Sequence, residues 1–78
     1  MLPVIYEQAN CIQCKMTKQE FDKLGLAYET INLDEQPRYR ERLKGMGYYQ
    51  APVIMTDECV WIGFRPDKIK AYKNGEFL

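Results

Sequence analysis

Two short apolar runs separated by one amphipathic stretch occupy the first 33 residues, and this order constrains the fold most strongly. Residues 3–6 are apolar and β-branched, and residues 28–33 are rich in β-branched and aromatic side chains, so both predict strands. Between them Thr17, Phe21 and Leu24 recur at helical spacing among charged residues, and a glycine closes the run. Strands joined by a helix of this length lie parallel, so the segment predicts a right-handed β-α-β unit.

The middle of the chain predicts a second helix and a hairpin. Residues 36–46 carry apolar side chains at helical spacing among charged ones: Tyr39, Leu43 and Met46. Residues 53–55 and 59–62 are short apolar runs on either side of a polar turn. Two such runs are typical of an antiparallel hairpin.

The last predicted element is a helix that begins at Pro66. Proline suits the first turn of a helix, and the spacing presents Ile69 and Tyr72 to the core. The predicted element order is therefore βαβαββα. Since 78 residues supply too few apolar side chains for a second core, we expect residues 1–78 to form a single domain.

Charge and cysteine content narrow the range of functions that this chain could have. Eleven Lys and Arg balance eleven Asp and Glu and histidine is absent, so no strong field draws the chain to nucleic acid or anionic lipid. The opening residues lack a basic region, and their apolar run is too short for a signal peptide or a membrane span, so we expect a cytoplasmic protein. Three cysteines are too few, and odd in number, for a structural disulfide framework. In a reducing compartment a close pair of them indicates catalysis, redox sensing or metal binding.

The segment Cys11-Ile12-Gln13-Cys14 lies where the first predicted strand gives way to the first helix. Two cysteines at this spacing can close a disulfide with little backbone change. We expect Asn10 to cap the helix, and the helix end to lower the pKa of Cys11 below the value of about 8.5 for a free thiol. Cys11 is then the nucleophile, and Cys14 resolves the mixed disulfide that forms on it.

Two other interpretations of the cysteine pair remain open. The pair could be half of a tetrahedral zinc site, but without histidine only Cys59 is left, and it cannot complete four ligands. The pair could also be two small buried side chains, although the strand before it and the helix after it favour a redox motif. Cys59 lies in a predicted strand with no second cysteine beside it, and we interpret it as a packing residue.

With these elements in place, the whole chain resembles the NrdH-type redoxins, which are glutaredoxin-sized proteins that behave like thioredoxins. Three segments carry the resemblance: Cys11-Ile12-Gln13-Cys14-Lys15-Met16-Thr17-Lys18, Gln50-Ala51-Pro52-Val53-Ile54 and Trp61-Ile62-Gly63-Phe64-Arg65-Pro66. The resemblance implies an α/β, thioredoxin/glutaredoxin-like fold. Its four-stranded mixed sheet would have the order 2-1-3-4 and be flanked by three helices.

The resemblance also implies a function. Members of this family take electrons from NADPH through thioredoxin reductase and reduce a disulfide in the large subunit of class Ib ribonucleotide reductase. We therefore expect those two proteins as partners of a monomer that binds no metal. We expect no bound cofactor either, because the redox-active disulfide Cys11-Cys14 carries the electrons.

The same resemblance assigns residues to the site. In the family, the proline at the Pro52 position follows a cis peptide bond beside the cysteines, whereas only about 5–6% of X-Pro bonds in folded proteins are cis. The partner-binding surface would comprise Ile12, Gln13, Ala51, Pro52, Trp61, Gly63, Phe64, Arg65 and Pro66. The stretch from Trp61 to Pro66 is equally explained as a strand end, a glycine turn and a helix start. Ala51 and Ile62 depart from the family, which commonly has leucine and a small hydroxyl residue there.

Two related classes are alternatives. Glutathione-dependent glutaredoxins hold the tripeptide with a Thr-Val-Pro segment, a Gly-Gly turn and acidic residues at the start of the last helix. This chain has Gln50-Ala51-Pro52 in the first place, Phe64 instead of the second glycine, and Asp67 as the remaining acid. A redox-sensing regulator of the Spx and arsenate-reductase type also opens with a strand and a Cys-x-x-Cys. Those proteins carry an inserted helical region and an Arg-Pro-Ile segment, for which this chain is too short and has no matching triplet.

Overall fold

A single mixed sheet organises residues 1–76, which are the residues that the computed structural model describes. The elements follow in the order β1 (Val4–Glu7), α1 (Ile12–Lys23), β2 (Glu29–Asn32), α2 (Pro37–Gly45), β3 (Val53–Met55), β4 (Val60–Ile62) and α3 (Pro66–Asn74). The strand order is β2-β1-β3-β4. β1 pairs parallel with β2 and antiparallel with β3, and β4 pairs antiparallel with β3. The predicted fold class and element order are confirmed.

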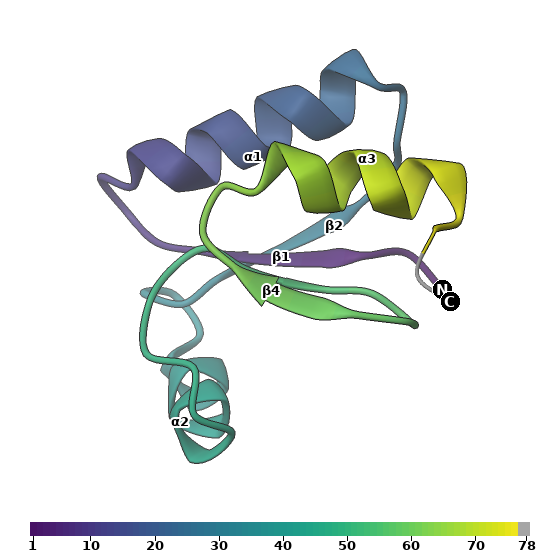
Figure 1. The fold of residues 1–78 in the computed structure, drawn as a ribbon. Coiled ribbons are helices and arrows are strands. Elements are labelled where there is room, and N and C mark those ends of the chain that lie inside the picture. Colours follow the sequence, from purple (N-terminus) through teal and green to yellow (C-terminus); the bar gives the residue numbers. More distant parts are fainter. Residues whose placement is uncertain (77–78) are drawn as a thin grey trace.

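Helices cover both faces of the sheet. α1 and α3 lie side by side over one face, and α2 lies against the other (Figure 1). Strand side chains alternate between the faces, so neighbours in sequence enter different cores. The α1/α3 side holds Ile5, Phe21, Ile54, Trp61 and Ile69, and the α2 side holds Tyr6, Leu33, Leu43 and Val53. Burial on both faces explains why the first three residues of β1, Val4 to Tyr6, form a continuous apolar run.

The helices use the apolar positions that their spacing predicts, with one exception. Thr17, Phe21 and Ile69 are fully buried, and Leu43 is 3% exposed. Met46, which we expected on the apolar face of the second helix, is 50% exposed, so that prediction is wrong. The reason is that α2 ends at Gly45 and Met46 is its C-cap residue, beyond the last packed turn.

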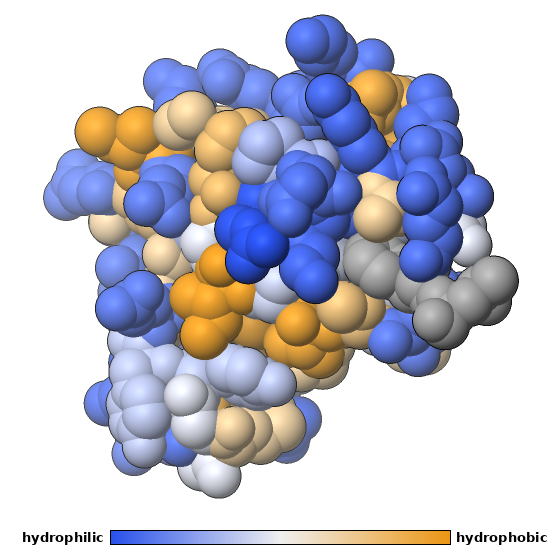
Figure 2. All heavy atoms as spheres, in the orientation of Figure 1, coloured by the Kyte–Doolittle hydropathy of each residue, from blue (hydrophilic) through white to orange (hydrophobic). Residues whose placement is uncertain are grey.

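β4 is an edge strand of only three residues. Figure 2 shows apolar surface gathering over β4, with polar side chains covering most of α3 beside it. Val60 and Ile62 are partly buried, and both pack against the α2-side core. A short edge offers few free backbone groups to another chain.

Three connections meet at one end of the sheet. The loop from β1 to α1, the loop from α2 to β3 and the loop from β4 to α3 all lie there, opposite the N-terminus (Figure 1). This arrangement brings the cysteine pair, Pro52 and Gly63 into one region although they are distant in sequence. None of the helices within residues 1–76 has the length and apolar character needed to span a bilayer.

Candidate dithiol site

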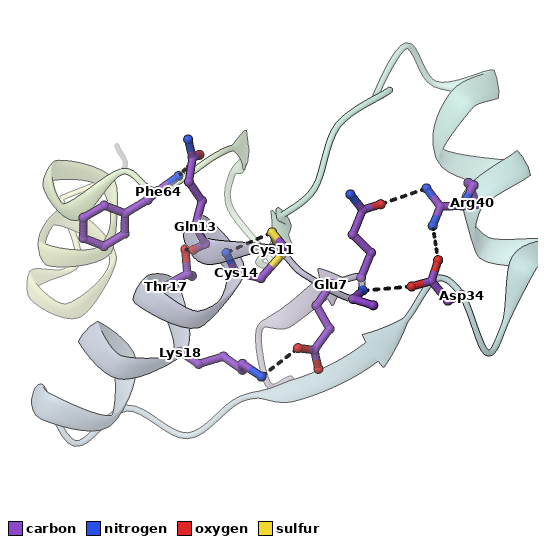
Figure 3. The surroundings of a disulfide bond; sticks show 11 residues. Glu7, Cys11, Gln13, Cys14, Thr17, Lys18, Asp34, Arg40 and Phe64 are labelled. Carbon is purple, nitrogen blue, oxygen red and sulfur yellow. Dashed lines mark hydrogen bonds and ion pairs between the residues drawn. A yellow bond between two sulfur atoms is a disulfide. The ribbon is translucent and has the colours of Figure 1, made fainter.

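Cys11 and Cys14 are joined in a disulfide, with their Cα atoms 5.2 Å apart. Cys11 is partly exposed, whereas Cys14 is only 2% exposed and lies in the first turn of α1 (Figure 3). The Cys14 N–H donates to Cys11 Sγ over 3.1 Å. The sulfur of Cys11 therefore accepts a hydrogen bond from the backbone. Because Cys11 is the more exposed residue, an attacking group reaches its sulfur before that of Cys14. This asymmetry agrees with the roles predicted for the two residues.

The N-cap of α1 differs from the prediction. Cys11, not Asn10, is the N-cap residue, because its sulfur accepts the Cys14 N–H that would otherwise be unpaired. Asn10 instead has φ of 56°, a left-handed conformation that asparagine tolerates better than most residues. Asn10 thus turns the chain so that the helix can start at the first cysteine, and the capping prediction is wrong by one residue.

An open groove of about 480 Å³ runs beside the disulfide. Its lining comes from the end of β1, the following loop and α1: Glu7, Gln8, Asn10, Cys11, Ile12, Cys14, Lys15 and Lys18. Lys18 Nζ lies 2.7 Å from Glu7 Oε1, and this ion pair joins α1 to β1 beneath the cysteines (Figure 3). Ile12 is 76% exposed at the rim, so the groove offers an apolar contact next to the reactive sulfur.

The loop between β1 and α1 is held from behind by a polar network. The Ala9 N–H donates to Asp34 Oδ2 over 2.8 Å, and Arg40 Nη2 donates to Asp34 Oδ1 over 2.9 Å. Arg40 Nη1 also donates to Gln8 Oε1 over 3.1 Å (Figure 3). These residues were not predicted, because a network that joins residues 8 and 40 leaves no local pattern in the sequence.

The Ala51-Pro52 peptide bond is cis, as the resemblance implied. Pro52 is buried immediately before β3, and its carbonyl accepts the Gly63 N–H over 2.9 Å. Ala51 is partly buried beside it. The segment before β3 is therefore tied to the loop that follows β4.

The loop from β4 to α3 contacts the cysteine motif directly. The Phe64 N–H donates to Gln13 Oε1 over 3.1 Å, which connects this loop to the residue before Cys14 (Figure 3). Arg65 and Asp67 form a double hydrogen bond of 3.1 and 2.9 Å across the start of α3. This bond lowers the pKa of Asp67 and raises the pKa of Arg65.

The remaining predicted partner-binding residues lie at different depths. Pro66 is exposed as the first residue of α3, and Gln13 is exposed on α1. Trp61 is 5% exposed and packs in the α1/α3-side core. Next to Gln13 the surface is formed by the loop after Trp61, and the indole packs in the core below it.

Replacing Gly63 with alanine should destabilise the protein. Gly63 has φ of 84°, and a Cβ there would lie 3.1 Å from Gln13 Oε1. A left-handed conformation costs a non-glycine residue about 1–2 kcal/mol, so Gly63→Ala should lower the free energy of unfolding by about that amount. Urea denaturation measures it. Gly45→Ala is the matched control, since nothing lies within 4 Å of its Cβ, and it should leave stability unchanged or raise it. Equal stability of the two variants would contradict the prediction.

A four-stranded mixed sheet with a disulfide at the start of α1 and a cis proline at the same end of the sheet defines a class: the thiol-disulfide oxidoreductases of the thioredoxin fold. The sequence profile of the glutaredoxin family matches residues 4–61, and the chain belongs to that family. Its relatives place it among the NrdH-type glutaredoxin-like redoxins.

Three comparisons support this placement. The chain is 42% identical over 65 residues to the glutaredoxin-like protein NrdH of Lactococcus lactis, covering 83% of this chain and 90% of that protein. It is 40% identical over 65 residues to the NrdH protein of Escherichia coli, covering 83% and 80%. The solved structure of the Escherichia coli NrdH-redoxin superposes with a TM-score of 0.87 at 38% identity, covering 90% of this chain and 92% of that one.

Proposed function

We propose that the protein carries electrons from NADPH, through thioredoxin reductase, to a disulfide in the large subunit of class Ib ribonucleotide reductase. The observation that carries the proposal is the unequal exposure of the two sulfurs in a chain that belongs with NrdH-type redoxins. One sulfur is placed to meet a partner and the other to release it. The proposal assigns the nucleophile to Cys11 and the resolving thiol to Cys14.

Each turnover consists of two thiol exchanges. The Cys11 thiolate attacks one sulfur of the client disulfide, forms a mixed disulfide and releases the other client sulfur as a thiolate. Cys14 then loses its proton, attacks Cys11 Sγ and releases the second client thiolate. The client has gained two electrons and the protein holds the Cys11–Cys14 disulfide, which thioredoxin reductase reduces again at the expense of NADPH.

Thioredoxin reductase is favoured over glutathione as the source of electrons by the start of α3. Asp67 is the acid that remains to hold the amino group of glutathione, but both of its oxygens already accept from Arg65. Phe64 occupies the position where glutaredoxins have a second glycine. The solved Escherichia coli NrdH-redoxin is itself described as having a thioredoxin-like activity profile.

We further propose that the protein acts in the cytoplasm as a monomer, with the cysteine pair as its redox group and no bound cofactor or metal. Its eleven basic and eleven acidic residues balance, which favours a protein partner over nucleic acid or a membrane surface. Sedimentation and light scattering measure the oligomeric state directly.

The proposal is tested by comparing two reducing systems. Insulin and a class Ib ribonucleotide reductase are supplied either with NADPH and thioredoxin reductase or with NADPH, glutathione and glutathione reductase. We expect turnover in the first system and at least about tenfold less in the second. Activity with glutathione alone would place the protein among glutathione-dependent glutaredoxins. If the protein reduced insulin but did not sustain turnover of ribonucleotide reductase, the proposed client would be refuted, whereas the thiol-disulfide exchange activity would stand.

A further inference from the structure

Glu7 is the sole carboxylate among the residues that line the groove beside the disulfide. It ends β1, and its partner Lys18 lies on α1 one turn after Cys14, so the two charges line the same groove as the cysteines (Figure 3). The exposed fractions of the two side chains are 18% and 33%. Both values are 33% or less, whereas each of the other ion pairs within residues 1–76 contains at least one side chain that is 49% exposed or more.

Charges that are partly buried act on their neighbours with less screening by solvent and salt. A carboxylate next to a thiol disfavours the thiolate, and an ammonium group favours it. In the oxidised protein both sulfurs are neutral, so these charges act on the reduced form and leave the disulfide form almost unaffected. The two members of the pair should therefore shift the thiol-disulfide equilibrium in opposite directions.

We propose that the Glu7–Lys18 pair sets the reducing strength of the dithiol. Glu7 disfavours the thiolate of the reduced form and so makes the protein a stronger reductant. Lys18 favours the thiolate and so makes the protein a weaker reductant. The ion pair with Glu7 holds the ammonium group of Lys18 in a fixed place. This inference rests on the proposed role as an electron donor, because the direction in which Glu7 acts is the direction that a donor needs.

Few other charges face this site. Lys15 is the second cation that lines the groove, and it comes from α1 as Lys18 does. Tyr28, just before β2, interacts electrostatically with Glu7. Behind the loop, Asp34 and Arg40 form their own ion pair. Glu7 is thus the carboxylate that shares the groove with the two cysteines.

The test is a pair of single substitutions with opposite expected effects. In equilibrium with a dithiothreitol redox buffer, Glu7→Gln should raise the ratio of reduced to oxidised protein by about three- to tenfold. This change corresponds to a reduction potential that is about 14–30 mV higher. Lys18→Gln should shift it by a similar factor toward the oxidised protein. Mass spectrometry after alkylation measures the oxidised fraction. Glu41→Gln and Lys44→Gln are the matched controls, because they make the same changes in an exposed ion pair on α2 and should shift nothing.

The dependence on pH separates an electrostatic effect from a structural one. The difference between Glu7→Gln and the unaltered protein should be small at pH values where Cys11 is a thiol, and should grow as pH rises and the thiolate forms. Shifts of the same sign for Glu7→Gln and Lys18→Gln, or no shift in either, would overturn the inference. The measurement uses no protein partner, so it is independent of whether ribonucleotide reductase is the client. A failure of the proposed function would instead appear as absent turnover in the unaltered protein.

Discussion

Replacing Cys11 with serine is expected to lower the rate of disulfide reduction by at least about 10³-fold, because a hydroxyl is a far weaker nucleophile than a thiolate. The loss should be this large because Cys14 is 2% exposed and cannot take over the attack on a folded client. The rate is measured as NADPH consumption with thioredoxin reductase and insulin. The melting temperature of the variant is compared with that of the reduced, unaltered protein. Equal melting temperatures would show that the loss of activity is chemical and not a loss of folding.

Cys59→Ser is the matched control for that experiment. Cys59 is a free, partly buried cysteine, and it packs against the α1/α3-side core as the sequence predicted. The same chemical change there should leave the turnover rate within about twofold, since surface and partly buried substitutions outside the reacting groups act mainly on stability. Full activity of Cys11→Ser, or loss of activity in Cys59→Ser, would contradict the assignment of the nucleophile.

Replacing Cys14 with serine is expected to trap clients on Cys11. The mixed disulfide still forms, but no neighbouring thiol displaces the client, so a covalent one-to-one complex should accumulate until the available protein is consumed. Non-reducing electrophoresis and mass spectrometry detect the complex, and dithiothreitol should release it. A structural zinc site would instead predict that the variant loses metal and unfolds, which metal analysis and circular dichroism would reveal.

The double variant Cys11→Ser/Cys14→Ser is the control for trapping, and it should form no complex. If Cys14→Ser turned over clients at the rate of the unaltered protein, a different thiol would have to resolve the mixed disulfide. If Cys11→Ser trapped clients and Cys14→Ser did not, the roles of the two cysteines would be reversed. Either result contradicts the order of attack inferred from their exposure.

Local patterns predicted the element order and the redox motif. The spacing of Thr17 and Phe21 predicts the buried face of α1, and both are fully buried. Pro66 begins α3 as expected. These signals succeed because helix periodicity and proline geometry are properties of a few adjacent residues. The N-cap prediction is wrong by one residue because asparagine is a usual capping residue and cysteine is not, although here the sulfur of Cys11 accepts the Cys14 N–H.

Long-range contacts were not predictable in the same way. The hydrogen bond between Phe64 and Gln13 joins residues 51 positions apart, and the ion pair of Glu7 and Lys18 depends on how α1 is placed over β1. Such contacts follow from tertiary packing and leave no periodic signal. The cis bond before Pro52 came from the family resemblance alone, because an isolated X-Pro sequence favours trans.

The burial of Cys14 also limits which disulfides the protein can reduce. Since only the sulfur at the helix start is open to the outside, a client must bring its own sulfur into the groove and past the exposed Ile12. A cystine enclosed in a rigid domain cannot make that approach. We therefore expect suitable clients to carry the bond on a protruding or unstructured segment that can enter the groove formed by the end of β1, the loop after it and α1.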